Sequence, residues 1–99
     1  MHIIKKSTLK LFWEKKPYQD SEKPLRFWYN EVKKATWENY NELKTDFPDA
    51  SIVGNDRVVF NIKGNDYRLI VKMIFKFGKV FIRFIGTHKQ YDKVNASEV

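Results

Sequence analysis

The sequence predicts an α+β protein in which an N-terminal strand and helices pack on one face of a small antiparallel sheet, in the order β-α-α-β-β-β. Two observations lead to this fold class. In the first half of the chain apolar residues recur at helical spacing, whereas after Pro48 they alternate with polar residues, as in strands. At 99 residues the chain has the length of one domain, which we expect to span residues 1–99.

The first half of the chain reads as a strand followed by helices. Residues 1–6 are a short apolar run that ends in two lysines and predicts the first strand. Ser7 has the hydroxyl that suits a helix N-cap, and Pro17 ends that helix. Ser21 is a second N-cap candidate. The helix after it carries an apolar stripe at Leu25, Trp28, Tyr29 and Val32. A third short helical segment is expected within residues 40–47.

The second half predicts three strands, at residues 58–62, 67–75 and 80–85. The motif Gly-Asn-Asp occurs at 54–56 and again at 64–66, and both copies are interpreted as turns because Gly and Asn tolerate positive φ. Consecutive strands joined by tight turns form an antiparallel meander. The N-terminal strand is expected to join the same sheet, with the helices covering one face.

Composition narrows the classes of function. Nineteen Lys and Arg against twelve Asp and Glu give a net charge of +7, which favours an anionic partner such as nucleic acid, an acidic protein or a membrane surface. The alternative is that the excess of positive charge only keeps the protein soluble. The absence of cysteine excludes disulfides and thiolate metal sites, and it fits a reducing, cytoplasmic location. Two distant histidines and no suitable carboxylate cluster predict neither a metal nor another cofactor.

Side chains alternate across a strand, so the strand at 67–75 has two unlike faces. The residues Leu69, Val71 and Met73 form an apolar face that we expect to contact the helices. Arg68, Ile70 and Lys72 form the other, open face. On the strand at 80–85 we expect Val80, Ile82 and Phe84 in the core, and Phe81, Arg83 and Ile85 on the open face. Two arginines on neighbouring strands can hold a phosphate. Alternatively, such charges only discourage pairing between sheet edges.

A possible proton-transfer group follows the last strand. His88 comes after Gly86 and Thr87, and imidazole is the side chain that exchanges protons near neutral pH. Tyr91 offers a phenol for stacking or proton transfer, and Asp92 a carboxylate that could orient either group. The alternatives are a surface histidine in a C-terminal tail, a tyrosine packed on the sheet edge and a solvated aspartate.

Residues 57–71 and 81–92 closely resemble the HigB toxins, which belong to the RelE/ParE superfamily of bacterial type II toxin–antitoxin systems. Shorter segments in the first half, at 12–15, 24–29 and 43–48, fit the same family. The resemblance therefore extends over essentially the whole chain. It implies a RelE-like fold.

The resemblance also implies an activity: a ribosome-dependent mRNA interferase, that is, an endoribonuclease that cleaves translated mRNA. Such toxins use no metal, and the 2′-hydroxyl of the RNA attacks the adjacent phosphate. Their partner is a HigA-type helix-turn-helix antitoxin. By resemblance, Arg68 stabilises the phosphate, His88 is the acid or base, and Tyr91 stacks on a base or assists proton transfer. Side-chain direction and charge add an RNA-binding or phosphate-binding group at Lys72, Arg83 and Lys89.

The sequence departs from the superfamily pattern in one respect. Some members carry a further histidine or glutamate as base ahead of the second sheet strand, whereas no histidine lies between His2 and His88 here. The general base is therefore left open. The ParE branch of the superfamily targets gyrase and often lacks such a site, so a gyrase-directed or non-catalytic protein-binding module is the alternative function.

Overall fold

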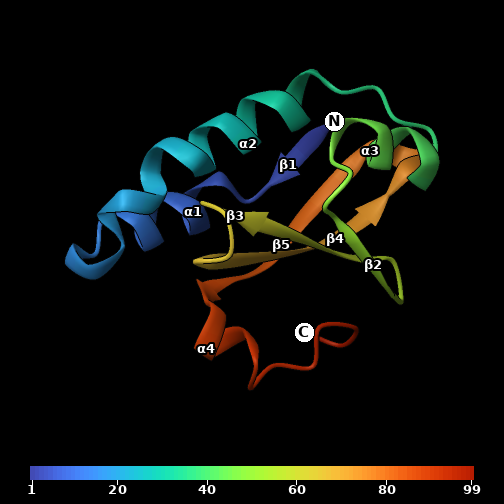
Figure 1. Cartoon of the computed structure of the whole chain (residues 1–99). Coiled ribbons are helices and arrows are strands. Elements are labelled where there is room, and N and C mark those ends of the chain that lie inside the picture. The colour runs from blue at the N-terminus through green and yellow to red at the C-terminus, as the bar shows by residue number, and fades with distance from the viewer.

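The computed structural model describes residues 1–99 and confirms the α+β class (Figure 1). Helices α1 and α2 lie on one side of a five-stranded sheet, and α4 and the C-terminal segment lie on the other. The strands are β1 His2–Ile4, β2 Ser51–Gly54, β3 Arg57–Ile62, β4 Tyr67–Ile74 and β5 Lys79–Thr87. The helices are α1 Lys6–Trp13, α2 Glu22–Lys34, α3 Tyr40–Asp46 and α4 His88–Tyr91, with 3-10 turns at Lys16–Ser21 and Phe75–Phe77.

The sheet has the order β1-β5-β4-β3-β2. The predicted meander is confirmed, because β3 pairs antiparallel with β4 and β4 with β5. However, β1 pairs parallel with β5, with Ile3 opposite Val80, so the sheet is mixed rather than antiparallel throughout. Alternation of apolar residues shows that a segment is a strand but not in which direction it pairs with a distant partner.

The short edge strand β2 was not predicted. All four of its residues are exposed, so it lacks the alternation that marks a half-buried strand. It forms a hairpin with β3 through Asn55 and Asp56, whose φ angles are +50° and +61°. Two consecutive residues with positive φ suit the right-handed twist of a hairpin, so the interpretation of 54–56 as a turn is confirmed.

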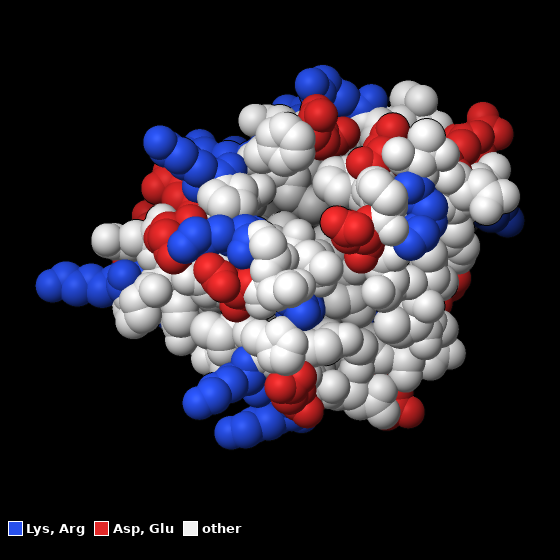
Figure 2. All heavy atoms as spheres, viewed as in Figure 1, with Lys and Arg blue, Asp and Glu red and all other residues white.

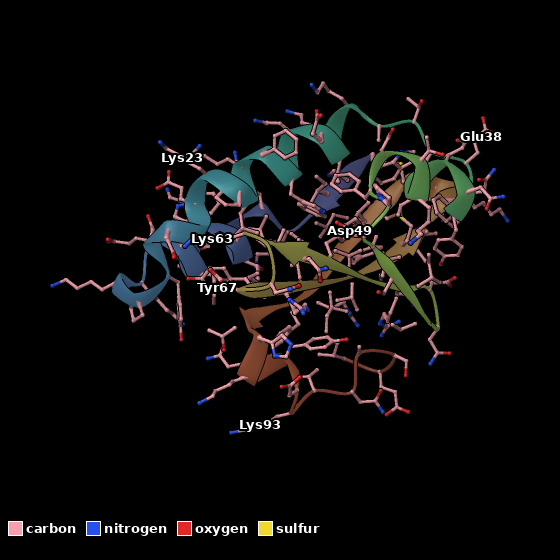
Figure 3. All side chains as sticks on the ribbon, in the orientation of Figure 1. Lys23, Glu38, Asp49, Lys63, Tyr67 and Lys93 are labelled. Atoms are coloured by element: carbon pink, nitrogen blue, oxygen red, sulfur yellow. The ribbon has the colours of Figure 1, made fainter.

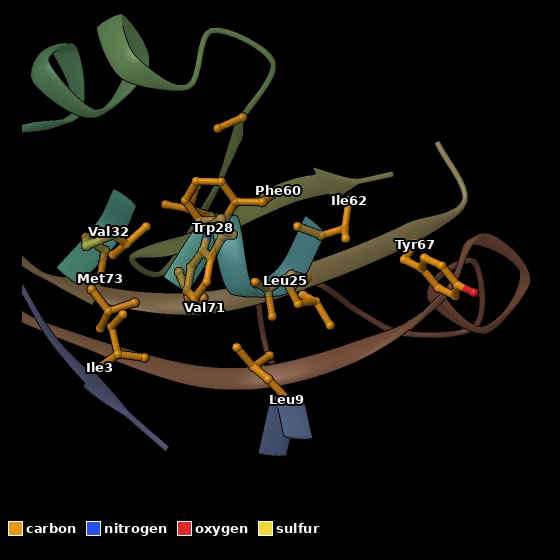
Figure 4. Packing of buried hydrophobic residues seen from close by; sticks show 14 of the residues in the cluster. Ile3, Leu9, Leu25, Trp28, Val32, Phe60, Ile62, Tyr67, Val71 and Met73 are labelled. Atoms are coloured by element: carbon orange, nitrogen blue, oxygen red, sulfur yellow. The ribbon is translucent and has the colours of Figure 1, made fainter. Parts of the chain in front are cut away.

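The helices and the sheet enclose one main hydrophobic core (Figure 4). The predicted stripe of α2 points into it: Leu25, Trp28 and Val32 are at most 1% exposed, and Tyr29 is half-buried. Trp28 packs its ring on Phe60 of β3, with 5.3 Å between the centroids. Burial of such large side chains is the main favourable term that holds α2 on the sheet.

The starts of the helices agree only in part with the predicted caps. α1 begins at Lys6, so Ser7 lies inside its first turn and is not the N-cap. Ser21 directly precedes α2 as predicted, but its hydroxyl donates to the carbonyl of Tyr18 at 2.6 Å. A 3-10 turn leads into α2 and gives Ser21 helical backbone angles, whereas a capping serine is extended. The third helix is confirmed as α3.

A β-bulge between β4 and β5 changes which side chains share a face. Ile70 pairs with Phe84 and Val71 pairs with Ile82, so Arg83 is an additional residue on β5. Beyond the bulge the alternation shifts by one position. Phe84 therefore lies on the face away from the helices. Ile85 instead packs against the main core, so both predictions were wrong. Val80 and Ile82 contact the core as predicted.

The face predicted to be open is partly covered. Val59 and Ile70 are 3% and 0% exposed, yet neither belongs to the main core, because they point away from α1 and α2. α4, which was not predicted, and the segment after it run across this side of the sheet (Figure 1). We call this surface the tail-side face.

Candidate functional site

The tail-side face is a grid of three rows across β3, β4 and β5, because directly paired residues share a face. The rows are Arg57, Lys72 and Phe81; Val59, Ile70 and Phe84; and Asn61, Arg68 and Gly86. A basic row thus lies on one side of an apolar row, and Arg68 lies on the other side.

Arg68 and Tyr91 come together at one end of this grid. The guanidinium carbon of Arg68 lies 5.8 Å from the centre of the Tyr91 ring, within the range of a cation–π contact. Nη1 of Arg68 donates to the carbonyl of Asn65 at 3.0 Å, which fixes the side chain over the β3–β4 turn.

α4 begins where β5 ends. The amide of Gln90 donates to Oγ1 of Thr87 at 3.2 Å, and the amide of Thr87 donates to Oε1 of Gln90 at 2.9 Å, which is a capping box. Gly86 leaves room for this exchange, since a Cβ there would lie 2.7 Å from Oε1 of Gln90. This capping box sets the start of α4, so that His88 is the first residue of the helix.

Two contacts position His88. Its amide donates to the carbonyl of Asp66 at 3.2 Å, and its Nδ1 lies 3.2 Å from Oδ2 of Asp92. An imidazole that donates from Nδ1 keeps an acceptor at Nε2, and the His88 side chain is 52% exposed, so that atom can reach a ligand. Asp92 therefore orients His88, which was one of the two interpretations open from the sequence.

The β3–β4 turn connects these groups. Its carbonyls hold both Arg68, through Asn65, and His88, through Asp66. Lys89 lies beside His88, and both line a shallow depression together with residues of the turn. Arg68, His88, Lys89 and Tyr91 are thus gathered at one end of the sheet.

Lys72 and Arg83 lie apart from that group. Lys72 is four residues along β4 from Arg68, about 13 Å away at the rise of a strand. It lies opposite Arg57 on β3, a residue for which no sequence pattern indicated a function. Arg83 occupies the bulge. The predicted site residues therefore form two clusters on one face rather than a single cluster.

The cations of the tail-side face have no Asp or Glu partners. Arg57, Arg68, Lys72 and Arg83 form no ion pair within 4.0 Å, whereas Arg26, Lys34 and Lys63 elsewhere each pair with Asp or Glu. Figure 2 shows mixed signs around the helices, and basic side chains that extend near α4. Cations without Asp or Glu partners make the tail-side face electropositive, which favours a polyanion as ligand.

A second polar cluster borders the depression beside His88. Asp20 accepts hydrogen bonds from the Tyr67 hydroxyl and, at 2.6 Å, from Nζ of Lys63. Figure 3 shows Lys63 and Tyr67 near each other at the end of the sheet. The bonds from Lys63 and Tyr67 lower the pKa of Asp20, whereas burial and the bond to Asp20 raise the pKa of Tyr67 to about 12. Asp20 is therefore a poor general base near neutral pH.

The stabilising effect of the Tyr67–Asp20 bond should disappear in alkali. The folded-state pKa of Tyr67 lies above the usual value of 10, so its contribution is complete below pH 10 and is lost as the pH rises towards 12. We expect Tyr67→Phe to lower the free energy of unfolding by about 0.5–1.5 kcal/mol at pH 8. The difference from wild type should shrink between pH 10 and pH 12 in denaturant titrations. A constant difference would contradict this account.

The chain matches a known protein family over most of its length. Residues 21–94 match the family model described as HigB_toxin, RelE-like toxic component of a toxin-antitoxin system. The chain is 34% identical to the mRNA interferase toxin HigB of Escherichia coli K12 over 93% of its own length and 88% of the relative's. It is 34% identical to the mRNA interferase HigB of Shigella flexneri over the same shares, and 29% identical to that of Escherichia coli O6:H1 over 95% and 91%.

The fold and these matches define the class: a RelE-like toxin of a toxin–antitoxin system. Within that class, the chain belongs to the HigB toxin family. None of its helices is both long enough and apolar enough to cross a bilayer.

Proposed function

We propose that this toxin is an mRNA interferase that cleaves translated mRNA on the ribosome, without a metal ion. The observation that carries the proposal is the gathering of Arg68, His88 and Tyr91 at one end of a face whose cations have no Asp or Glu partners. The names of the curated relatives support the same activity.

In the proposed reaction the 2′-oxygen of one ribose attacks the adjacent phosphorus while the bond from phosphorus to the 5′-oxygen breaks. The products are a 2′,3′-cyclic phosphate and a 5′-hydroxyl. Arg68 donates hydrogen bonds to the phosphate oxygens, where negative charge develops. His88, held at Nδ1 by Asp92, transfers the proton to the leaving 5′-oxygen or accepts one from the 2′-hydroxyl.

The remaining groups bind the RNA. Tyr91, whose ring is fixed against Arg68, offers a surface on which a base can stack. Lys89 lies next to His88 and can contact a neighbouring phosphate, and Lys72 and Arg83 extend the basic surface along the sheet. The proposed partners are the ribosome with its mRNA and a HigA-type helix-turn-helix antitoxin, all in the cytoplasm.

The decisive experiment is a translation assay with purified components. Cleavage should appear as new mRNA 5′ ends, mapped by primer extension, only when ribosomes translate the message. Toxin that has been stripped of metal ions with EDTA should cleave equally well once it is returned to the magnesium-containing assay. Uncut message together with inhibited gyrase would replace the proposal by the gyrase-directed alternative.

RNA binding should depend steeply on salt. The chain carries a net charge of +7, and each neutralised single-strand phosphate contributes a slope of about −0.7 to the plot of log affinity against log salt. With four cations on the tail-side face, we expect a slope of roughly −2 to −3 for a short oligoribonucleotide. Fluorescence anisotropy between 50 and 300 mM KCl measures it. An affinity that is independent of salt would exclude an electrostatic RNA surface.

Expression of the toxin alone should arrest growth, and co-expression of its antitoxin should restore it. The basic tail-side face is the surface that we expect the antitoxin to shield, because its cations form no ion pair with Asp or Glu. Growth curves and co-purification test this expectation. Soluble, folded toxin that leaves growth unchanged without an antitoxin would indicate a degenerate protein.

A further inference from the structure

Two arginines from different strands converge on one oxygen of the C-terminal segment. Nε and Nη2 of Arg57 in β3 donate to the main-chain oxygen of Val99 at 3.1 and 2.9 Å. Nε of Arg83, the bulge residue of β5, reaches the same oxygen at 3.4 Å. A forked guanidinium contact supported by a second arginine is the geometry with which proteins hold phosphate oxygens.

Arg57 is unusual for a charged side chain. It is 8% exposed, yet no Asp or Glu side chain lies within ion-pairing distance. Its other hydrogen bond goes from Nη1 to the carbonyl of Asn55 at 2.8 Å. Burial of a charge is costly unless it is well paired, so the position beside Arg57 favours an anionic oxygen.

Apart from the arginine contacts, one hydrogen bond joins the C-terminal segment that covers Arg57 to the β2–β3 turn. Nδ2 of Asn55 donates to the carbonyl of Ser97 at 2.9 Å, and the Val99 side chain is half-buried. We call residues 95–99 the strap. In Figure 1 the strap ends on the side of the sheet away from α1 and α2. Beneath it lies the basic row that Arg57 forms with Lys72.

We propose that Arg57 and Arg83, with Lys72 beside them, form a second phosphate-binding subsite for the RNA backbone, and that the strap occupies this subsite until RNA displaces it. The inference rests on the proposed function, because it takes the mRNA strand as the ligand. A strand that runs along β4 meets Arg68 at the catalytic end and this subsite four residues further on.

The strap then acts as an internal competitor. If the subsite is free for only a fraction of the time, the apparent affinity for RNA is the intrinsic affinity multiplied by that fraction. A strap that is bound 70–90% of the time lowers the affinity by about 3- to 10-fold. Loosening the strap should therefore strengthen RNA binding, but only when Arg57 is present to use the vacated position.

The test uses full-length variants and an uncleavable 12-nucleotide 2′-O-methyl oligoribonucleotide. Asn55→Gly combined with Val99→Gly removes the Asn55–Ser97 hydrogen bond and the half-buried Val99 side chain without changing charge, and it keeps the Val99 oxygen that Arg57 contacts. Glycine tolerates the φ of +50° at position 55. We expect this pair of changes to tighten binding about 3- to 10-fold in the wild-type background. In an Arg57→Gln background the same pair should have no effect. Arg26→Gln, an exposed arginine on α2, is the charge-matched control and should preserve the gain.

A second measurement follows the strap directly. The chain has no cysteine, so Glu98→Cys gives a single position for a spin label. The label should be immobile in the free protein, mobile with saturating oligonucleotide, and mobile from the start in Arg57→Gln. A label that stays immobile while the oligonucleotide binds would overturn the subsite. The subsite would also be overturned if loosening the strap raised the affinity for the oligonucleotide equally with and without Arg57.

The two proposals fail in distinguishable ways. Wild-type toxin that cleaves mRNA while its strap stays immobile refutes the subsite and leaves the interferase activity intact. Wild-type toxin that releases its strap on binding the oligonucleotide but cleaves nothing refutes the activity and leaves the subsite intact. Thermal unfolding of each variant identifies any loss of binding that comes from unfolding.

Discussion

His88→Ala should slow cleavage of translated mRNA by about 100- to 10,000-fold, the usual contribution of a positioned acid or base. The side chain is half-exposed and its polar contact is with the exposed Asp92, so stability should change by no more than about 0.5 kcal/mol. Single-turnover cleavage on stalled ribosomes, alongside thermal unfolding, measures both effects.

The chain supplies its own control for this experiment. His2, the only other histidine, is exposed on β1 at the edge of the sheet away from β2, and His2→Ala should leave cleavage unchanged. If the His88→Ala variant cleaves at the wild-type rate, His88 has no part in the proposed mechanism. A large loss of stability in His88→Ala would show instead that the role of His88 is structural.

Arg68→Ala should lower the cleavage rate about 100- to 1000-fold, because it removes the cation that faces the charge developing on the phosphate. Arg68→Lys should recover only part of the rate, since an ammonium keeps the charge but not the planar fork of donors. The variants should bind the ribosome nearly as well as wild type if the lost interaction belongs to the transition state. Rate and binding are measured separately in a single-turnover assay.

Arg26→Ala is the matched control for Arg68→Ala. Arg26 pairs with Glu22 on the exposed side of α2, far in the fold from the tail-side face, so its loss should leave the chemical step unchanged. Equal losses of rate in both variants would mean that net charge alone matters and that Arg68 has no specific role.

Local patterns predicted much of this fold. The 3.6-residue period of α2, the alternation of β3 and the two Gly-Asn-Asp turns are each contained within a few residues, and each was confirmed. The meander followed from those turns. Arg68 and Lys72 were placed on the correct face because β4 alternates without interruption.

The errors come from features that depend on distant parts of the chain. The bulge at Arg83 is visible only in the pairing of β5 with β4, so uninterrupted alternation assigned Phe84 and Ile85 to the wrong faces. The last residues of the chain cover part of the tail-side face, and no periodic pattern in the sequence indicates that contact. For the same reason Arg57 was missed: its burial depends on a contact with Val99, at the far end of the chain.

The position of β5 has a consequence for how the toxin is made. β5 lies inside the sheet, between β1 and β4, although it is the last strand to leave the ribosome during synthesis. β1 has no partner until residues 79–87 are available, and the proposed catalytic residues His88 and Tyr91 come directly after them. Pairing between opposite ends of a chain is also slow to form. A nascent chain therefore cannot assemble the proposed site before residues 79–91 have left the ribosome.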